Sequence, residues 1–543
     1  MSDNSVPAVT DADTDAPPRH YLVITYPSWA HNRSELALAL TLLHLNPSLL
    51  ITVLIHSNRS KASALEMAQY PPLSNPERMR VVHYGNEGQV EGEGMFNPRG
   101  GFRAQIAQET EGWAEKLAKD SELSTGNRAG ELLNVVEHGR MRRIRTGSPI
   151  ISDITLALFA HAIKGAVALS EPERTPPKAF AFCPYNAAFI VQLFVEELSG
   201  YVPRVRRAVI GIDDEEEKAK RLDKASFILS NEDILHIPGT SPAHYYELAP
   251  IAKESMTKAL SLRPDMPQMT SVFFDGAIIG WPACLSADLE PAIAKTLGAS
   301  FAVGPALPRR GAEEWSVELH QGACDAYLDE VLRTDGPQSL LYISFGSVVF
   351  APSEQQLSIL FDVLEELHLP FILAQGNAQE GNCPPEVRDM MLQRVGKGKN
   401  RGLLLPWAPQ RAILDHPATG LFLSHGGSNS ALEAIMSRVP MSFDQPSIAN
   451  ELDTLGAARE LFQIRDGPNI GRPVARNGIV VQGTPEAIRA EMLDVFGGLR
   501  GLRGDWIAAL RARGDEVCER VREDRKVGTS HENLMRLAFL DRT

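Results

Sequence analysis

The chain has 543 residues, of which 43% are hydrophobic and 22% are charged, a balance typical of a soluble globular protein. This length exceeds what one hydrophobic core usually serves, so we expect two domains. The net charge is −14 and the sequence has no long basic run, which argues against nucleic acid as a partner.

Several features indicate a cytoplasmic protein. The five cysteines are scattered, odd in number and without the spacing of a metal site, as expected of reduced thiols. Residues 1–19 are polar and acidic, as in a disordered tail, and lack the basic start and apolar stretch of a secretion signal. No apolar run approaches the roughly 20 residues that a membrane helix needs. We therefore expect a cytoplasmic chain without a membrane segment, and we expect it to be a monomer.

The first half of the chain alternates apolar runs with helical stretches. This alternation is typical of βαβ units and a parallel sheet. A helix marked by Leu36, Leu40 and Leu43 follows the first run. The expected strands lie at 21–25, 49–55, 80–84, 150–153, 180–184, 227–230, 277–280 and 301–305. Ligands of such sheets bind at the carboxyl ends of the strands.

Prolines 305 and 308 break regular structure after the last of these runs, so we expect a connection between domains there. Further buried strands are expected at 339–345, 371–375, 403–406 and 420–424. Thr484 is a suitable N-cap for a helix over 485–496. The predicted division is a tail at 1–19, a first domain at 20–305, a connection at 306–336, a second domain at 337–510 and a charged helical region at 511–543.

One stretch of the second half combines a strand, a glycine loop and a helix. The run at 420–424 leads into residues 425–430, which include two glycines, and Leu432, Ile435 and Met436 then continue with helical spacing. Free N–H groups at a helix N-terminus bind phosphate, and glycines allow a close backbone approach. Glu433 lies four residues after Asn429, where a carboxylate can accept from ribose hydroxyls. The two glycines alone are equally compatible with an ordinary turn between a strand and a helix.

The whole stretch resembles the donor-binding signature of the family 1 UDP-dependent glycosyltransferases. The residues that match in order and spacing are Trp407, Ala408, Pro409, Gln410, His416, Pro417, Ser424, His425, Gly427, Asn429, Ser430, Glu433, Val439 and Pro440. Residues 344–347 are also similar to the family's S-F-G-S strand end. The resemblance implies an α/β protein of the GT-B fold, in which two facing Rossmann-like domains with parallel sheets border a cleft.

The resemblance also implies roles for the donor-binding residues. Trp407 would stack on uracil, Ala408 would contact the base edge, and Gln410 and Glu433 would hold the ribose. The diphosphate would be held by side chains of the glycine loops and the helix start, namely Ser347, His425, Asn429 and Ser430. Gly427 would belong to the same donor-binding loop. His425 would add positive potential there. The resemblance implies no metal and no cofactor besides the UDP-sugar co-substrate.

His31 is the candidate general base. A histidine with a pKa near 7 can deprotonate a hydroxyl, and a carboxylate on its other nitrogen fixes the tautomer. His31 follows the first strand, as the family's base does, within a P-x-x-G-H-x-N-P type segment. Here Ala30 replaces the glycine, and Arg33 and Ser34 replace the Asn-Pro pair. Asp153 matches the family's partner carboxylate. From the sequence alone, His31 can equally be a surface or capping residue, and Asp153 a helix N-cap.

The pair that contacts the sugar is open between two positions. Asn450 and Glu451 fit the spacing from Pro446 and are preferred, although the family has an acid followed by glutamine. Asp444 and Gln445 have the usual residue types but stand about five positions early.

These residues predict an inverting transferase that moves a hexose, with UDP-glucose as the expected donor, to a hydroxyl of a small and largely apolar acceptor. Loops at 85–104 and 185–205 would form the acceptor pocket. A UDP-sugar epimerase on the same fold and a UDP-sugar-binding protein that has lost catalysis are the alternatives. A dinucleotide oxidoreductase is disfavoured, because no Gly-x-Gly-x-x-Gly follows the first strand.

Overall fold

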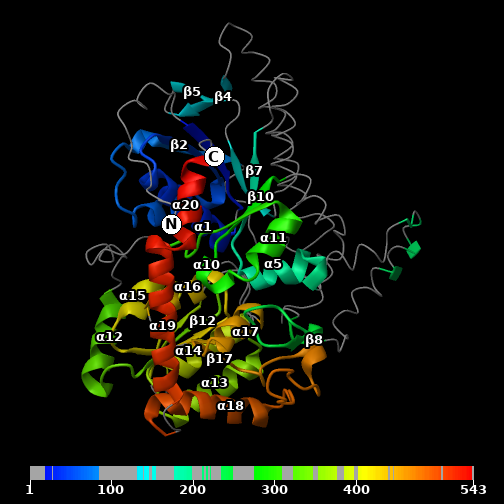
Figure 1. Cartoon of the computed structure of the whole chain (residues 1–543). Helices are drawn as coiled ribbons and strands as arrows, with labels where there is room; N and C mark the ends of the chain where they lie inside the picture. The colour runs from blue at the N-terminus through cyan, green and yellow to red at the C-terminus, as the bar shows by residue number, and fades with distance from the viewer. Residues whose placement is uncertain are drawn as a thin grey trace, which may run out of the picture.

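The computed structural model divides the chain into two α/β halves, shown in blue to green and in yellow to orange (Figure 1). The structure describes residues 19–26, 28–84, 131–137, 140–145, 149–154, 177–198, 211–212, 214, 216–217, 220–221, 234–248, 274–307, 322–346, 352–375, 385–396, 401–437, 441–443, 446–502 and 506–540. The strand expected at 227–230 and the loop at 85–104 lie outside these residues.

The first half contains a parallel sheet of seven strands in the order β11-β10-β7-β6-β1-β2-β3. Its strands are β1 (Arg19–Ile24), β2 (Leu49–His56), β3 (Met79–Tyr84), β6 (Ile150–Asp153), β7 (Ala179–Cys183), β10 (Gly276–Ile279) and β11 (Ala299–Ala302). Seven of the eight expected runs are therefore confirmed as strands. Two short antiparallel pairs accompany the sheet: β4 (Glu131–Glu137) with β5 (Arg140–Arg145), and β8 (Ile234–Leu235) with β9 (Ala243–His244).

The second half contains a parallel sheet of six strands in the order β14-β13-β12-β15-β16-β17. Its strands are β12 (Leu340–Ser344), β13 (Phe371–Ala374), β14 (Gly402–Leu405), β15 (Thr419–Ser424), β16 (Met441–Phe443) and β17 (Ala458–Glu460). Two mainly parallel sheets in one chain agree with the expected pair of Rossmann-like domains.

Helices cover both sheets. In the first half they are α1 (Trp29–Leu45), α2 (Ser60–Met67), α5 (Ala187–Phe194), α10 (Ala283–Ser286) and α11 (Glu290–Leu297). In the second half they are α12 (Gly322–Asp335), α13 (Glu354–Glu366), α14 (Pro385–Gly396), α15 (Gln410–Asp415), α16 (Ser428–Ser437), α17 (Pro446–Thr454), α18 (Pro485–Gly497), α19 (Trp506–Val527) and α20 (Thr529–Ala538). Thr484 caps α18 as predicted, because its side chain accepts from Ala487 N–H.

The central strands are buried on both faces, which is why they read as continuous apolar runs and not as alternating ones. In the first domain, Leu36 and Leu43 of α1 pack with Val53 of β2 and Leu537 of α20. In the second domain, α13 and α18 pack on the six-stranded sheet of that domain. Burial of this kind contributes about 25 cal/mol per Å² of apolar surface and dominates folding.

Helix α12 lies inside the stretch expected as a connection between domains, and it packs on the second domain. Tyr327 of this helix donates to the carbonyl of Arg401, 2.8 Å away. Leu328 and Val331 are fully buried. Of the described helices, none has the length and apolar character required to cross a membrane.

The charged C-terminal region returns to the first domain. Helix α19 runs from the second half to the first, and α20 then lies beside α1 (Figure 1). Tyr21 donates its hydroxyl to the carbonyl of Leu537 at 2.6 Å, and Asn46 donates to the carbonyl of Ala538 at 2.7 Å. The end of the chain thus ties the two domains together.

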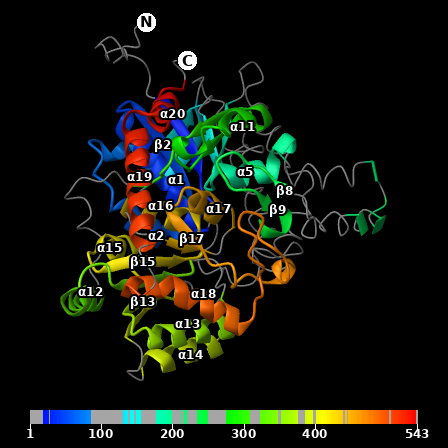
Figure 2. The same ribbon diagram turned by 60° about the horizontal axis from the view of Figure 1, so that its bottom comes forward.

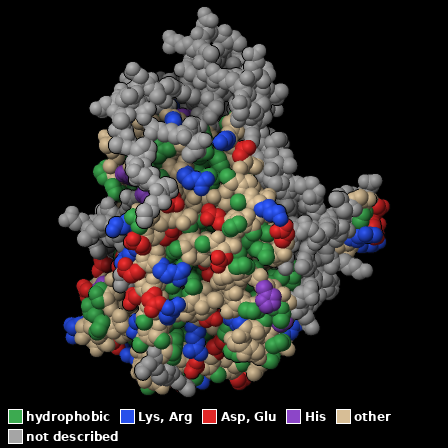
Figure 3. Space-filling model, viewed as in Figure 1, with side chains coloured by type: hydrophobic (Ala, Val, Ile, Leu, Met, Phe, Trp, Pro, Cys, Tyr) green, Lys and Arg blue, Asp and Glu red, His purple; other side chains and the backbone are tan. Residues whose placement is uncertain are grey.

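On the face seen in Figure 3, acidic and basic side chains are interspersed.

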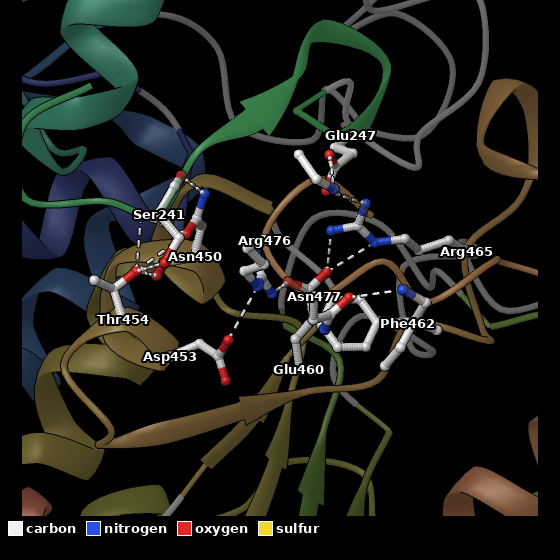
Figure 4. Close-up of polar contacts among 12 residues, drawn as sticks. Ser241, Glu247, Asn450, Asp453, Thr454, Glu460, Phe462, Arg465, Arg476 and Asn477 are labelled. Atoms are coloured by element: carbon white, nitrogen blue, oxygen red, sulfur yellow. Dashed lines mark hydrogen bonds and ion pairs between the residues drawn. The ribbon is translucent and has the colours of Figure 1, made fainter. Parts of the chain in front are cut away.

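A second tie joins the segment 234–248 to the second domain (Figure 4). The backbone of Ser241 exchanges two hydrogen bonds with the Asn450 side chain, at 3.1 and 2.9 Å. Glu247 accepts from Ala475 N–H at 2.8 Å and lies 3.7 Å from Arg465, which also pairs with Glu460. The side chains of Glu247, Glu460 and Arg465 are buried. A buried charge is costly without a partner, and here each charge has one of opposite sign.

Candidate active site

The predicted base and its partner meet at the carboxyl ends of neighbouring strands. Strands β1 and β6 are adjacent in the first sheet. His31 lies on α1, directly after β1, and Asp153 ends β6. His31 Nδ1 lies 2.7 Å from Asp153 Oδ2, and the side chains are 14% and 0% exposed. A histidine that donates Nδ1–H to a carboxylate keeps Nε2 free to accept a proton.

Two tyrosines that the sequence analysis did not single out flank this histidine. Tyr185 follows β7, and its hydroxyl lies 3.3 Å from His31 Nε2. The rings of Tyr26 and Tyr185 lie 5.3 and 5.5 Å from the imidazole, centroid to centroid. Phe189 extends this aromatic surface, 5.2 Å from the Tyr185 ring. The position of both tyrosines just after strands is the signal that could have identified them.

On the donor side, β15, the loop after it and α16 form the predicted strand, glycine loop and helix. The His425 ring lies against two glycines. A Cβ atom on Gly346 would stand 2.6 Å from Nε2 of His425, and one on Gly427 would stand 2.4 Å away. Any larger residue at either position would displace the ring.

The environment of His425 corrects one expectation. Burial lowers the pKa of His425 to about 4, so the ring is neutral at pH 7. The positive potential that the sequence analysis assigned to it is therefore missing. A neutral imidazole can still donate one hydrogen bond, and the N-terminus of α16 supplies the remaining positive potential.

The two residues expected to hold ribose lie side by side. Gln410 Nε2 donates to Glu433 Oε2 at 2.6 Å and lies 3.2 Å from the hydroxyl of Ser430. The hydroxyl of Tyr342 donates to Gln410 Oε1 at 3.2 Å. The Gln410 amide is thus held in one orientation by Tyr342, Ser430 and Glu433, all of the same domain.

Trp407 is exposed, as a residue that stacks on a ligand must be, with 48% of its surface accessible. Its ring lies edge-on to Trp29, with centroids 6.4 Å apart. Ala408 is buried next to it. Ser347, Asp444 and Gln445 lie outside the described residues.

The base helix and the donor helix touch. Asn429 Nδ2 donates to the carbonyl of Ala30 at 2.7 Å, and the hydroxyl of Ser34 donates to Asn429 Oδ1 at 2.8 Å. In both ribbon views α16 lies between α1 and the second sheet (Figure 1, Figure 2). The predicted phosphate ligand Asn429 is therefore bonded across the domain boundary to the helix turn that carries His31.

Asn450 and Glu451 are engaged away from the donor loop. Both side chains are buried, and Asn450 is bonded to the Ser241 backbone. The carboxylate of Glu451 accepts from Asn186 Nδ2 at 2.6 Å and from Trp281 Nε1 at 2.8 Å. Burial raises the pKa of Glu451 to about 7. Both side chains serve the contact between the domains, which argues against the sugar contact preferred from spacing.

Comparisons with known sequences identify related proteins. Residues 322–465 match the family described as UDP-glucoronosyl and UDP-glucosyl transferases. The UDP-glycosyltransferase eriJ of Hericium erinaceus is 35% identical over 209 residues, which are 36% of this chain and 39% of that protein. A Gardenia jasminoides crocetin glucosyltransferase is 32% identical over 193 residues, 34% of this chain and 43% of that protein.

Over residues 322–465 the chain is thus similar to the UDP-dependent glycosyltransferases. These alignments span less than half the length of either relative. Structural similarity extends further. A Medicago truncatula structure complexed with UDP-glucose has a TM-score of 0.62 and 17% identity, over 96% of this chain and 97% of that one. A UDP-glucosyltransferase from Polygonum tinctorium has a TM-score of 0.62 and 18% identity, over 98% and 100%. The fold of this chain is therefore GT-B, as the resemblance implied.

Proposed function

We propose that this chain transfers a hexose from a UDP-sugar to a hydroxyl of a small acceptor, with inversion at the sugar carbon and His31 as general base. The observation that carries the proposal is the pairing of His31 with Asp153 at 2.7 Å. His31 lies on α1, and the first turn of this helix bonds to Asn429 of α16, the helix of the proposed donor site. A base and a donor-binding helix in contact satisfy the main requirement of transfer, which is to hold two substrates in line.

The reaction is a single displacement. The acceptor hydroxyl gives its proton to His31 Nε2, its oxygen bonds to C1 of the sugar, and the bond from C1 to the diphosphate breaks. UDP leaves with the electron pair, and attack from the opposite face inverts C1. Asp153 stabilises the imidazolium, a role worth about 10²–10⁴-fold together with the base. The N-terminus of α16, with Asn429 and Ser430, would stabilise the leaving diphosphate.

The surroundings of the base favour a flat, apolar acceptor. Tyr26, Tyr185 and Phe189 form an aromatic surface beside Nε2. A phenol can lie against such rings while its hydroxyl reaches the imidazole, and aromatic contacts are worth about 0.5–1.5 kcal/mol beyond burial.

Glucose is the proposed sugar. A Gardenia jasminoides relative and a Manihot esculenta relative are both named as glucosyltransferases. In this chain, Asp444 is the remaining candidate for the sugar contact, and a second carboxylate from UDP-glucuronate beside it would cost on the order of a few kcal/mol at an effective dielectric near 20. Arg33, which reaches over from the first domain, is already paired with Glu66 and Glu433.

A cytoplasmic location is part of the proposal. Cys183, Cys284, Cys324 and Cys518 are free thiols. Free thiols are favoured where glutathione and thioredoxin keep cysteines reduced. Tagged full-length chain recovered from a secreted fraction with oxidised cysteines would contradict this part.

The test is an assay of the purified full chain with UDP-glucose and a panel of phenols and alcohols, read by mass spectrometry. A new product heavier than an acceptor by one hexose residue is expected. Equal amounts of UDP-glucose and UDP-glucuronate then compete, and a majority of glucuronide would exclude the assignment of glucose. Binding of UDP without product from any acceptor would favour the alternative of a UDP-sugar-binding protein, and a changed sugar on UDP would favour an epimerase.

A further inference from the structure

A buried arginine of α1, the helix that carries His31, reaches the carboxylate of Glu433, the residue of the other domain that is expected to bind ribose. Arg33 stands two residues after His31 on α1. Its Nη2 lies 2.5 Å from Glu433 Oε1, and its Nε lies 3.0 Å from Glu66 Oε1. The side chains of Arg33, Glu433 and Glu66 are 12%, 0% and 2% exposed. The ion pair therefore crosses the domain boundary almost out of contact with water.

A second arginine completes a neutral set of four charges. Arg411 Nε lies 3.6 Å from Glu433 Oε1, and Arg411 Nη2 lies 3.9 Å from Glu66 Oε2. Although burial by itself lowers the pKa of Arg33, the carboxylates of Glu433 and Glu66 raise it well above its usual value. The guanidinium thus stays charged and keeps its partners in place. We call Arg33, Glu66, Arg411 and Glu433 the charge quartet.

The quartet fixes the orientation of the Glu433 carboxylate. Both arginines lie on the side of Oε1, whereas Oε2 accepts from Gln410 at 2.6 Å. Ribose hydroxyls would reach Glu433 at Oε2, where they would share or replace the hydrogen bond from Gln410. A carboxylate held in this way needs no reorientation when a ligand arrives, which lowers the ordering cost of binding.

Two departures from the family segment face the donor helix. Arg33 and Ser34 stand where the family has Asn-Pro. Arg33 pairs with Glu433 and Ser34 bonds to Asn429, which are the residues expected at the ribose and at the phosphate. The altered loop thus supplies contacts to the donor site from the helix that carries the base.

We propose that Arg33 is a positioning residue for the donor: it reaches across the domain boundary and fixes the carboxylate of Glu433 for the ribose hydroxyls. This inference rests on the proposed function, because it takes the donor to be a uridine diphosphate sugar. It assigns the altered segment after His31 a function in donor binding.

The test is the selectivity of the full chain for UDP over 2′-deoxy-UDP and 3′-deoxy-UDP, measured by calorimetry. The wild-type chain should bind UDP about 10- to 100-fold more tightly than at least one deoxy analogue, the range of a hydrogen bond to a charged group. In Arg33→Gln this ratio should fall to less than about threefold. Glu433→Gln should lower this ratio similarly. Arg33→Lys should keep only part of the wild-type ratio, because an ammonium retains the charge but cannot bridge two carboxylates as a guanidinium does.

Arg465→Gln is the matched control. Arg465 is a buried arginine paired with Glu460 in the other interdomain network (Figure 4). Its loss should lower the melting temperature and leave the ratio between UDP and the deoxy analogues at the wild-type value. A purely structural role of Arg33 would make the two arginine variants behave alike.

Arg33→Gln leaves the quartet with one excess negative charge, so Arg33→Gln/Glu66→Gln is included to keep it neutral. A folded single or double variant that keeps the wild-type ratio of affinities for UDP and its deoxy analogues would overturn the proposal. Failure of both variants to fold would also overturn it, because Arg33 would then be a structural residue. A wild-type chain that does not bind UDP would refute the proposed function itself. UDP binding without discrimination between ribose and deoxyribose in the wild type would refute only the role of Arg33.

Discussion

The proposed base side and the proposed donor side of the site differ in how the chain builds them. Most donor-side residues come from one continuous stretch, 407–433, in which a strand, a loop and a helix follow each other directly. The base side is assembled from His31, Asp153 and Tyr185, which come from three strand ends far apart in the sequence. The donor side can therefore be identified by spacing, whereas the base side depends on long-range packing.

The two sides should also respond differently to mutation. A base acts only as the reaction proceeds, so its loss lowers turnover and leaves ground-state binding unchanged. A residue that stacks on the nucleotide contributes to binding before and during the reaction, so its loss changes affinity. The first two predictions separate the sides on this ground, and the last two concern contacts between the domains.

The largest effect is expected for His31→Ala. Turnover with an ordinary alcohol should fall by at least about 100-fold, because no other group would take the proton at neutral pH. Affinity for UDP should change little, since the hydrogen bonds that the structure shows for the His31 ring go to Asp153 and Tyr185 of the first domain. Steady-state kinetics and calorimetry on UDP measure the two quantities. Near-normal transfer by a folded variant would remove His31 from the role of base.

Trp407→Ala should give the converse result. Loss of stacking on the uracil should weaken UDP binding by about 1–3 kcal/mol. The fold should survive, because the ring is 48% exposed and contacts Trp29 only edge-on. Trp29→Ala is the matched control, with a smaller loss of affinity. Unchanged UDP affinity combined with a lower melting temperature would indicate that Trp407 is structural.

Sequence analysis succeeded where residues interact with near neighbours in the sequence and failed where the outcome depends on burial or on partners distant in the sequence. The strand, loop and helix around His425 followed from local spacing. The charge of His425 did not, because it depends on burial between Gly346 and Gly427. Docking of α20 beside β1 and α1, through Tyr21 and Leu537, joins residues 516 positions apart. No local pattern encodes such a contact.

The pair preferred for the sugar contact illustrates the same limit. Asn450 and Glu451 were preferred because their distance from Pro446 matches the family. Their partners Ser241, Asn186 and Trp281 belong to the first domain. A buried carboxyl between two N–H donors at a domain contact cannot be distinguished in sequence from one that faces a ligand.

Glu451→Gln should change how stability depends on pH. Because burial raises the pKa of Glu451 to about 7, the folded chain holds a proton between pH 5 and 7 that the unfolded chain releases. Rising pH therefore favours unfolding, and Glu451 should lower the free energy of unfolding by on the order of 1–2 kcal/mol over this window. The difference between wild type and variant, from urea unfolding at pH 5, 6 and 7, isolates this contribution. Parallel pH profiles would contradict it.

Glu491 offers a control for this effect. Burial also raises the pKa of Glu491 to about 7, but its carboxylate accepts from Phe462 and Gln463 N–H within the second domain. Glu491→Gln should remove a similar pH dependence. Only Glu451→Gln should also alter the contact of the second domain with Asn186 and Trp281, detectable as faster hydrogen exchange in α5.

The smallest effect is expected for Ser34→Ala, which tests whether the two sides are coupled. The carbonyl of Ala30 can only accept, so the amide nitrogen of Asn429 must face it and the amide oxygen must face Ser34. Loss of the hydroxyl removes one hydrogen bond worth about 1 kcal/mol and leaves the other to hold the amide. UDP affinity should fall by less than about fivefold. Thr41→Ala removes a hydroxyl from the same helix, bonded only to the carbonyl of Ala37, and should leave UDP affinity unchanged. Equal UDP affinities in the two variants would mean that the contact between α1 and α16 joins the domains without acting on the donor.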